Sequence, residues 1–557
     1  MLFRSKSYPA PELTVDWKKV LFNQFHDTAA GSGIGRIYKD AQQDYDVVRL
    51  STNAITQSSL EKVVEGIDTQ GEGTPVVIFN PLGWTRSGKV RIKAQVPYKE
   101  GYHFRIVPPR STKQISYPSR VSWDKQTGVA EMDVDVEAQA LGYAVYHLVL
   151  EADNTGRRGE SVAQIPQSFE SDSMIRIRNS ELQLTVDKTT GCITSLQMHW
   201  SQPQDKRWAT VEEGLPPARP SEVVVETVAP GGCANELQTF KDTPKDYDAW
   251  NIDPGTLDQP VPLVRADRVE LVGGDTRSPG VRVTRTWQRS RFVQTISLRT
   301  GADQVDVDNE IDWHETHVLL KAAFPLAVSN DHATYEIPYG TIDRPTTRNN
   351  SWEKAQFEVP AMRWADLSGA GVGGRVHGLS VINESKYGYD AADNVLRLTL
   401  LRSPVWPDPE ADRGHHHFRY ALYPHQGTWK EALSVRHGWE FNYPLTAVTT
   451  IAHPGLLPAV YSFASVAPEN LVLTAMKKAE DGNALILRAY EWAGKATAAR
   501  FRIPPGAASA VITNLMESNE TPTAGALDVT GDVVKVPIHP YEILTLRVDY
   551  PNGAVKQ

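Results

Sequence analysis

Cysteine and long apolar runs are both scarce in this sequence. Only Cys192 and Cys233 occur among its 557 residues. Two cysteines do not imply a disulfide framework, and a reducing compartment fits them best. No stretch approaches the roughly 18 continuous apolar residues of a membrane-spanning helix. The first residues, 1–7, also lack the apolar core of a secretory signal. We therefore expect a cytoplasmic protein with no membrane partner.

A basic excess is missing as well. The sequence has 58 Lys and Arg against 67 Asp and Glu, which gives a net charge of -9. Phosphate binding needs a basic footprint, so nucleic acid is excluded as a partner. A hydrophobic content of 40% with 22% charged residues is typical of a globular protein and excludes a mostly disordered chain. The length exceeds one hydrophobic core and indicates about three or four domains.

The first 68 residues have helical periodicity. Apolar residues recur at three- and four-residue spacing around Trp17 and Leu21, with Thr14 or Asp16 as the expected N-cap. After the small-residue turn 29–33, a second stripe continues without Pro or Gly between Gly35 and Gly66. Its members are Ile34, Ile37, Tyr38, Ala41, Tyr45, Val48, Thr52, Ile55 and Ser59. The pattern predicts one long helix in a small bundle, and because two helices seldom form a stable bundle alone, we expect further upstream structure.

The remainder of the chain has the period-two pattern of β-strands. The run 76–79 before the turn Asn80-Pro81-Leu82-Gly83 is an example, and similar runs continue to residue 548. A polar linker is predicted at 153–159 and a surface loop at 202–221. The predicted fold is therefore mainly β, with several β-sandwiches behind an N-terminal helical-bundle segment. The expected domains are 1–68 (partial helical bundle), 69–165, 166–442 (a large sandwich) and 443–557.

A His-Asp pair stands out at the end of the first predicted helix, in the segment Asn23-Gln24-Phe25-His26-Asp27-Thr28-Ala29-Ala30-Gly31-Ser32. Small residues after the pair would leave it at the rim of an open cavity. A neutral imidazole is a good zinc ligand, and an adjacent carboxylate can orient a ligand or accept hydrogen bonds from sugar hydroxyls. Taken alone, such a pair is more often a helix-end hydrogen bond, so both interpretations stay open at this point.

The segment 17–27 together with Gly31-Ser32 resembles the middle domain of the family 38 glycoside hydrolases, the α-mannosidases. Similar segments follow in order over nearly the whole chain. They are Asp246–Asp253, Asp312–Glu315, Leu319–Lys321, Ala333–Ile337, Arg344–Thr346, Arg363–Ser368, Asn383–Tyr389, Leu400–Pro404 and Tyr423–Gly427. The sequence looks most similar to the cytosolic and bacterial branch of the family.

This resemblance implies a fold and a mechanism. Such enzymes have an N-terminal α/β barrel, a three-helix bundle and several β-sandwiches, the largest of them mutarotase-like. Their zinc ion is held by a His and an Asp of the barrel, the nucleophilic Asp and a His of the bundle, whose equivalent here is His26. Asp27 would contact the mannose ring. The mechanism is retaining, with two carboxyl groups about 5–5.5 Å apart, and the partner is an α-mannoside or oligosaccharide substrate.

The chain departs from this pattern at its start. The nucleophile, the acid/base and the other metal ligands belong to a barrel of roughly 250 residues, which would precede residue 1. We therefore expect no catalytic nucleophile in this chain, and expect it to be inactive alone or to require a separate barrel domain. Two alternatives stay open: a free-standing carbohydrate-binding β-sandwich protein, and one subunit of a split mannosidase. Linkage preference and oligomeric state are not predicted, although an oligomer is allowed.

Weaker signals point mostly to structural roles. Gly31–Gly35 imitates part of a dinucleotide fingerprint but follows a helix rather than a strand, so we reject it. His415, His416 and His417 cannot all face one ion from an extended backbone and are predicted to lie in a surface turn. The run 314–317 is predicted to lie within a sheet. Four residues remain as candidates for sugar contacts, with core or interface roles as the commoner alternative: Asp248, Trp250, Tyr335 and Arg344.

Overall fold

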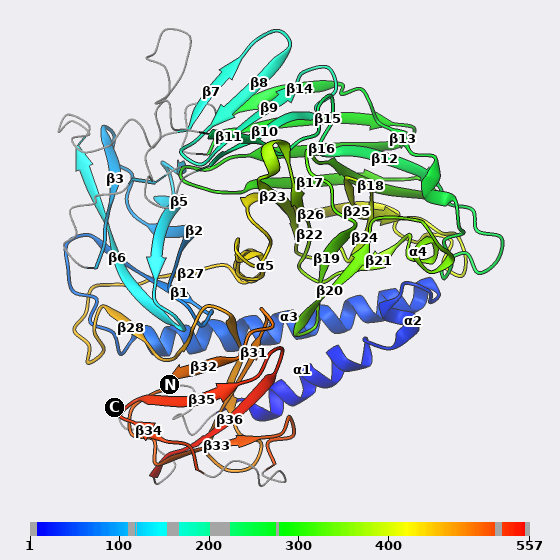
Figure 1. The fold of residues 1–557 in the computed structure, drawn as a ribbon. Helices are drawn as coiled ribbons and strands as arrows, with labels where there is room; N and C mark the ends of the chain where they lie inside the picture. The colour runs from blue at the N-terminus through cyan, green and yellow to red at the C-terminus, as the bar shows by residue number, and fades with distance from the viewer. Residues whose placement is uncertain are drawn as a thin grey trace. The chain divides into compact units, whose positions relative to one another are not determined.

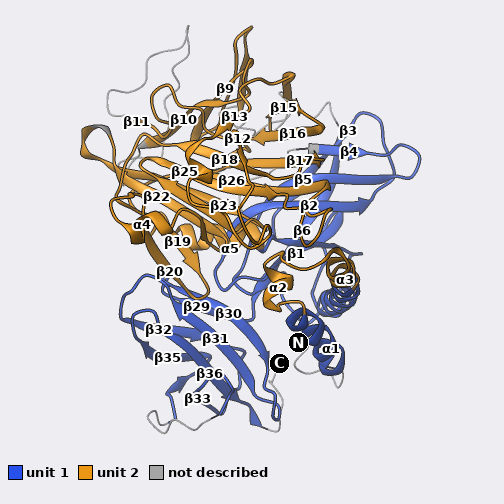
Figure 2. Ribbon diagram, turned by 90° about the vertical axis from the view of Figure 1, so that its right-hand side faces the viewer, with its two compact units in different colours: residues 1–22, 44–160, 443–557 blue, residues 23–43, 161–442 orange. Residues whose placement is uncertain are grey.

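The computed structural model describes residues 8–109, 117–118, 120–152, 166–200, 223–273, 278–518 and 526–551. Strands make up 48% of the structure and helices 14%, which confirms the mainly β fold class. The chain forms two compact units, shown in different colours in Figure 2. Unit 1 comprises Met1–Phe22, Asp44–Glu160 and Tyr443–Gln557, and unit 2 comprises Asn23–Gln43 and Ser161–Asn442. Both the predicted linker 153–159 and the whole of the predicted loop 202–221 lie outside the described residues.

Unit 1 begins with helix α1 (Ala10–Phe22) and contains most of α3 (Gly35–Val64), the single long helix that the absence of Pro and Gly predicts. The N-cap predicted at Thr14 or Asp16 is wrong, because α1 already begins at Ala10. The Thr14 hydroxyl donates to Ala10 O (2.7 Å) inside the helix. Asp16 is buried and accepts a hydrogen bond from Ser51 Oγ of α3 (2.7 Å), so it joins the two helices.

The apolar residues of α1 are largely exposed in the described structure, with Trp17 and Leu21 at 62% and 63%. The predicted stripe of α3 is less exposed from Ala41 onward, because Ala41 is buried and Val48 and Ile55 are half-buried, whereas Leu50, which lies outside the stripe, is 69% exposed. In unit 1 the two helices contact each other through polar pairs, Asp16 with Ser51 and Lys19 with Asp44. Periodicity therefore predicted the helices correctly, and polar pairs join α1 to α3.

The strands of unit 1 form four antiparallel sheets, and Figure 1 labels most of these strands. The first has the order β27-β1-β6-β28 with β3 on β6, and the second the order β2-β5-β4. The third and fourth have the orders β29-β32-β35-β34 and β30-β31-β36-β33. The strands of the first two are β1 (Thr74–Asn80), β2 (Arg86–Gln95), β3 (Tyr102–Val107), β4 (Arg120–Trp123), β5 (Val129–Ala138), β6 (Gly142–Ala152), β27 (Thr446–Thr449) and β28 (Val460–Ser462). Those of the last two are β29 (Ser465–Ala467), β30 (Leu471–Lys478), β31 (Leu485–Glu491), β32 (Thr497–Arg502), β33 (Ser509–Thr513), β34 (Val529–Thr530), β35 (Val533–Ile538) and β36 (Ile543–Asp549).

Each pair of these sheets encloses a hydrophobic core. Val76, Ile92 and Val134 belong to the core between the first two sheets, and Leu473 and Phe501 to that between the last two. Strands β27 and β28, which follow residue 443 in the sequence, complete the sheet of β1 and β6. The division into four domains stays a prediction.

Unit 2 contains three antiparallel sheets around one large core. The nine-stranded sheet has the order β14-β15-β16-β17-β26-β23-β22-β19-β20, the six-stranded sheet β13-β12-β18-β25-β24-β21, and the five-stranded sheet β11-β10-β9-β8-β7. The first ten strands are β7 (Gln167–Glu170), β8 (Met174–Arg178), β9 (Leu182–Asp187), β10 (Ile193–Trp200), β11 (Val223–Glu226), β12 (Glu236–Lys241), β13 (Val261–Pro262), β14 (Arg268–Val272), β15 (Gly280–Trp287) and β16 (Ser290–Ser297). The remaining ten are β17 (Val305–Trp313), β18 (Val318–Pro325), β19 (His332–Ile337), β20 (Gly340–Pro345), β21 (Val359–Pro360), β22 (Trp364–Ala370), β23 (Val376–Asn383), β24 (Gly388–Ala392), β25 (Val395–Arg402) and β26 (Gly414–Gln426).

The helices of unit 2 are short. They are α2 (His26–Ala29), η4 (Thr256–Asp258), α4 (Ser351–Ala355), η5 (Val372–Gly374) and α5 (Ser434–Asn442), besides the start of α3. The strands carry most of the core, as in β17, whose residues alternate between buried and less buried positions. One inward face per strand is the cause of the period-two pattern in the sequence.

A disulfide joins Cys192, between β9 and β10, to Cys233, just before β12 (Cα–Cα 5.1 Å). The low cysteine count, from which no disulfide framework was expected, did not predict this bond. Loops that neighbour each other in the sandwich bring together residues 41 positions apart, a proximity that composition alone does not contain.

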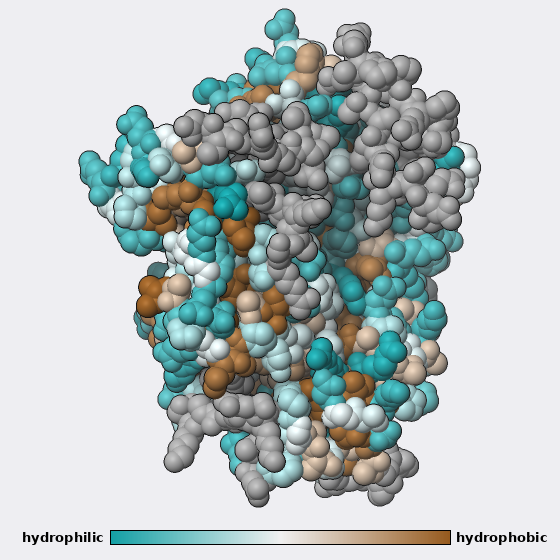
Figure 3. All heavy atoms as spheres, turned by 90° about the vertical axis from the view of Figure 1, so that its left-hand side faces the viewer, coloured by the Kyte–Doolittle hydropathy of each residue, from teal (hydrophilic) through white to brown (hydrophobic). Residues whose placement is uncertain are grey.

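The described surface is mixed in polarity. On the face drawn in Figure 3, apolar residues form separate patches among hydrophilic ones. No helix in the described part of the chain is both long and apolar enough to cross a bilayer.

Candidate functional site

His26 and Asp27 form the first turn of α2, as neighbours in unit 2. His26 Nε2 lies 3.4 Å from Asp27 Oδ2, and the side chains are 78% and 38% exposed. The imidazole ring packs beside that of Phe25, with centroids 4.4 Å apart. The pair is therefore presented at the surface of the described structure, with the His26 ring open to an incoming ligand.

A compact turn holds Asp27 in place. Ser32 N donates to Asp27 O (3.0 Å), and Ser32 Oγ lies 3.3 Å from Asp27 Oδ1. The Tyr38 hydroxyl also donates to Asp27 O (3.3 Å) and accepts from Gly33 N (2.6 Å). Gly31 has φ +78°, a left-handed conformation that suits glycine at the end of the short helix. The small residues of this segment thus close the turn behind the His-Asp pair.

The described residues alone do not fit a zinc site. They contain no group of three His, Cys, Asp or Glu side chains placed to hold a metal ion. A catalytic zinc ion usually takes three protein ligands, whereas the α2 segment offers at most one imidazole and one carboxylate. His26 can therefore serve as one ligand only if other donors come from outside the described structure.

A cavity of about 1100 Å³ lies within unit 2, next to this segment. One wall comes from the end of α2 and the start of α3, beginning at Ala30 and Gly31. The other wall comes from Ala249 and from residues between Arg402 and Asp412. The first wall residue follows Asp27 by only three positions. Polar side chains line the cavity as well, among them Lys39, Gln42, Glu410 and Asp412.

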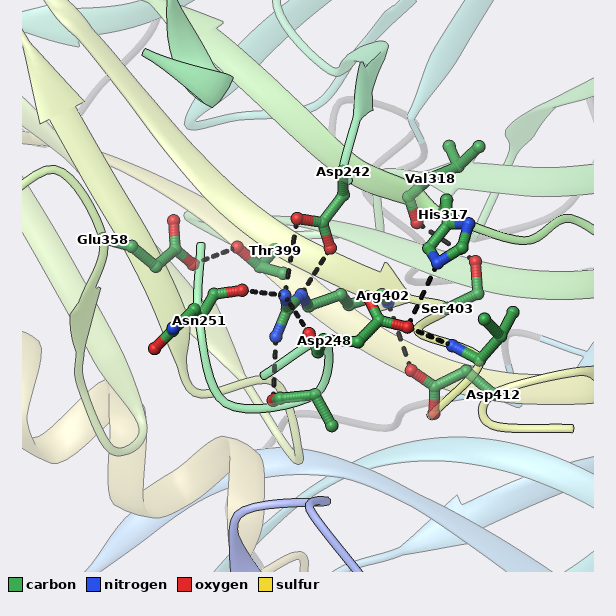
Figure 4. A network of polar contacts seen from close by, with 12 residues as sticks. Asp242, Asp248, Asn251, His317, Val318, Glu358, Thr399, Arg402, Ser403 and Asp412 are labelled. Atoms are coloured by element: carbon green, nitrogen blue, oxygen red, sulfur yellow. Dashed lines mark hydrogen bonds and ion pairs between the residues drawn. The ribbon is translucent and has the colours of Figure 1, made fainter. Parts of the chain in front are cut away.

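Arg402, at the end of β25, organises one wall of the cavity (Figure 4). Its guanidinium pairs with Asp242 (Nε–Oδ2 2.5 Å) and donates to the carbonyls of Asp248 (2.8 Å), Ala249 (2.9 Å) and Asn251. Asp242 is fully buried, and this burial raises the pKa of its carboxyl although Arg402 opposes the shift. One planar cation therefore fixes the backbone of the loop 248–251.

The Asp248 side chain fixes the second loop, which contains Val405 and Trp406. Its Oδ2 accepts from the backbone N–H groups of Val405 (2.7 Å) and Trp406 (3.2 Å) and lies 3.1 Å from His317 Nε2. Among the four residues predicted as candidates for sugar contacts, Asp248 is thus mostly a structural anchor.

The other three candidates differ in position. Trp250 is 46% exposed and remains available to a ligand, whereas Tyr335 is 1% exposed and belongs to the sandwich core. Arg344 lies over the Tyr335 ring (5.0 Å) and donates to Pro360 O (3.1 Å). The prediction of a sugar contact is therefore wrong for Tyr335, because alternation along β19 turns its ring inward.

Two positions predicted for histidines are also wrong. His415, His416 and His417 lie in strand β26, not in a surface turn, and pair with β17. The run 314–317 lies in the connection between β17 and β18 rather than within a sheet. His317 is useful there because it reaches Asp248.

Sequence reasoning missed the role of Arg402. The segment Leu400–Pro404 resembles the family, but no pattern within it indicates that Arg402 binds a loop about 150 residues earlier in the chain. Only the pairing of β18 with both β12 and β25 brings the two loops together.

Three family models match the chain in order. The α-mannosidase middle domain matches residues 2–63, the glycosyl hydrolases family 38 C-terminal domain matches 220–410, and the family 38 C-terminal β-sandwich domain matches 470–546. Together these ranges take in more than half of the sequence.

Curated relatives are consistent with this match. Human alpha-mannosidase 2C1 is 30% identical over 97% of this chain and 46% of its own length. Alpha-mannosidase G of Dictyostelium discoideum is 26% identical over 97% of this chain and 48% of its own length. The chain thus spans about half the length of the curated relatives it matches.

Solved structures show the same fold. An alpha-mannosidase from Enterococcus faecalis superposes with a TM-score of 0.71 at 15% identity, over 97% of this chain and 64% of that one. Because the middle domain, the C-terminal domain and the C-terminal sandwich follow one another in the family's order, this chain belongs to glycosyl hydrolase family 38, a family of α-mannosidases.

Proposed function

We propose that the chain supplies the middle and C-terminal part of a retaining, zinc-dependent α-mannosidase that hydrolyses terminal α-mannosides, in free form or in oligosaccharides. The observation that carries the proposal is the exposed His26–Asp27 pair, which lies inside the segment matched by the α-mannosidase middle domain.

His26 would be one of the zinc ligands. Its side chain is 78% exposed, which leaves the imidazole free to meet donors from another domain. Asp27 would accept hydrogen bonds from the hydroxyls of the terminal mannose, with its backbone carbonyl already held by Ser32 and Tyr38. A zinc ion bound there would polarise sugar hydroxyls and favour distortion of the ring.

The chain alone is proposed to be inactive. A retaining glycosidase needs two carboxyl groups about 5–5.5 Å apart on either side of the glycosidic bond, and these would come from an N-terminal barrel. The apolar helical face of unit 1, which we define as Trp17, Leu21, Phe22, Val47 and Leu50, supports a docking role. These side chains are between 49% and 76% exposed. Large apolar side chains gathered on two adjacent helices are typical of a surface that another domain covers.

Two further expectations remain proposals. A cytoplasmic location is suggested by the sequence, but the Cys192–Cys233 disulfide is more usual in oxidising compartments. A free-standing carbohydrate-binding protein would not need the apolar helical face, whereas a subunit of a split mannosidase would. The oligomeric state is left open.

Reconstitution tests the proposal. The 557-residue chain would be produced alone and together with the barrel domain of a family 38 enzyme, preferably one encoded upstream of it. Zinc content and hydrolysis of an aryl α-mannoside would then be measured. We expect activity and zinc only in the reconstituted protein, with loss of both in His26→Ala. The exposed His332→Ala serves as a matched control that leaves both unchanged. Activity of the isolated chain, or full activity of His26→Ala, would contradict the proposal.

A further inference from the structure

Three aromatic rings stand exposed on two neighbouring loops of unit 2. Tyr247 and Trp250 lie between β12 and η4 and are 65% and 46% exposed, and Trp406 lies between β25 and β26 and is 53% exposed. The Trp250 and Trp406 rings are side by side, with centroids 5.3 Å apart and planes at 41°. Tyr247 meets Trp250 edge-on at 6.5 Å. We call these three rings the aromatic ledge.

The exposure of the ledge does not come from loose loops. Arg402 donates to three carbonyls of the 248–251 segment, and the Asp248 carboxylate accepts from Val405 N and Trp406 N. The two loops therefore fix each other, as the dashed contacts in Figure 4 show. Large rings held toward water on a fixed backbone have little conformational entropy left to lose when a ligand binds.

The backbone beneath the ledge is also unusual. Tyr247 has φ +59°, the left-handed conformation that non-glycine residues seldom adopt. Two hydrogen bonds to its carbonyl, from Trp250 N (2.9 Å) and Asn251 N (3.0 Å), hold it there. Strain of this kind persists where the surrounding contacts over-determine it, commonly at ligand sites.

The ledge adjoins the cavity described above. Ala249, Pro404 and Pro407, which are neighbours of the ledge residues in sequence, line the cavity, and its opposite wall begins at Ala30, close to Asp27. The lining of this cavity includes the charged and amide side chains of Lys39, Gln42 and Glu410. Exposed aromatic rings near a cavity with polar lining suit a ligand that carries both apolar C–H faces and hydroxyl groups better than they suit an apolar protein surface.

We propose that the aromatic ledge and the adjoining cavity bind the sugar units of an α-mannose oligosaccharide beyond the terminal residue. A pyranose ring has an apolar C–H face that packs on an aromatic plane, while its hydroxyls reach polar groups at the rim. The proposal rests on the proposed function for the identity of the sugar. It adds a site for the remainder of the substrate, separate from the His26–Asp27 pair.

The test measures the binding of sugars to the 557-residue chain itself, by calorimetry and by tryptophan fluorescence. We expect α-linked mannotriose to bind at least about tenfold more tightly than mannose. Trp250→Ala and Trp406→Ala should each weaken binding of the trisaccharide by about tenfold or more. Trp352→Ala is the matched control, because Trp352 lies in α4 and is 82% exposed. Trp406→Phe, which keeps a flat ring, should retain binding within about threefold.

Several outcomes would overturn this inference. The first is that the intact chain does not bind mannotriose at about 10 mM. The second is that the ledge variants and Trp352→Ala lose the same amount of affinity for mannotriose. The third is that Trp406→Phe binds as weakly as Trp406→Ala while circular dichroism shows that both remain folded. A ledge variant that binds sugar normally but no longer associates with a barrel domain would assign the ledge to a protein contact instead. Hydrolysis is not a readout here. Sugar binding without activity in the reconstitution assay would leave the ledge established and contradict only the proposed function.

Discussion

Lys321 Nζ lies 2.8 Å from Asp390 Oδ1, and neither side chain reaches solvent. The ammonium, on β18, also pairs with Glu358 and donates to Thr399 Oγ1 (2.7 Å) on β25. Burial raises the pKa of the Glu358 carboxyl, and the charge of Lys321 opposes that shift. Lys321 therefore compensates Glu358 and, together with Arg397, which pairs with Asp390 Oδ2 (2.9 Å), also compensates Asp390.

Replacing this cation should destabilise unit 2 strongly. Lys321→Met removes the cation that pairs with Glu358 and leaves Asp390 with Arg397 alone, for which a loss of about 3–5 kcal/mol in the free energy of unfolding is expected. Urea denaturation followed by fluorescence measures it. Lys354→Met, at an exposed position in α4, should change stability by no more than about 0.5 kcal/mol. Equal stability of the two variants would mean that the carboxylates are neutral in the folded protein.

The disulfide should make stability depend on redox conditions. Cys192 and Cys233 close a loop with a sequence separation of 41, which corresponds to about 4 kcal/mol of stabilisation in the chain-entropy model. We expect a reducing agent to lower the melting temperature of the parent protein and to leave that of a Cys192→Ala/Cys233→Ala double variant unchanged. Peptide mapping without reduction checks the bond directly. Two free thiols in the native protein would disprove it.

Acid should loosen the sheet β2-β5-β4 through Asp133. Burial by itself would raise the pKa of this carboxyl, but the hydrogen bond from Arg91 (3.0 Å) and the charges of Arg91 and Lys89 outweigh burial and hold the pKa below its usual value. The unfolded chain then binds more protons as pH falls. The stabilisation is complete above the unfolded value of about 3.9 and is lost as pH falls through the folded value.

Hydrogen exchange of β2 and β5 can measure this effect. Protection in the parent protein should fall as pH drops below about 4, while Asp133→Asn should be less protected than the parent at pH 7 and change less with acid. Glu137→Gln, at an exposed position in β5, is the control. An identical pH response in parent and Asp133→Asn would contradict the prediction.

The apolar helical face should matter for assembly and not for folding. Leu21→Lys and Leu50→Lys alter side chains that are 63% and 69% exposed, so the free energy of unfolding should change by about 0.5 kcal/mol or less. Association with a barrel domain, measured by calorimetry or by restored activity, should weaken more than about tenfold. Lys62→Ala, an exposed change on the same long helix, should leave association unaltered. Strong unfolding of either Leu variant would place these residues in a core instead.

Local features of the fold could be predicted from the sequence. The uninterrupted run 36–64 gave α3 as one helix, and the alternation before Asn80 gave β1 and its turn. The predicted stripe marks the less exposed side of α3 from Ala41 onward, but the hydrogen bond of Ser51 with Asp16 that joins α3 to α1 could not be predicted from it. The Cys192–Cys233 bond could not be predicted because it depends on strands and loops that pair across long stretches of chain.

The candidate site also contains features that the sequence could predict and features that it could not. His26 and Asp27 are adjacent in sequence and could be recognised as a pair, and their proposed roles stay predictions. The contacts of Arg402 with Asp248 and Asn251 join loops 154 and 151 positions apart, so no local pattern contains them. Long-range pairing, which sets the position of the aromatic ledge, is the part of the fold that a single sequence specifies least directly.

The interrupted course of unit 1 along the chain has a consequence for biosynthesis. The Thr69 hydroxyl bonds to Ile451 O, 382 positions later, and β1 pairs with β27 over the same span. At about 5–20 residues per second, a ribosome needs roughly 20–80 s to make the intervening chain. During that interval one edge of β1 has no native neighbour, and an unpaired strand edge is prone to aggregation. A nascent chain of this protein should therefore depend on chaperones until its last 110 or so residues emerge. A chain truncated after unit 2, which lacks β27 and β28 as well as the C-terminal sandwich, should be less soluble than a chain that lacks the C-terminal sandwich alone.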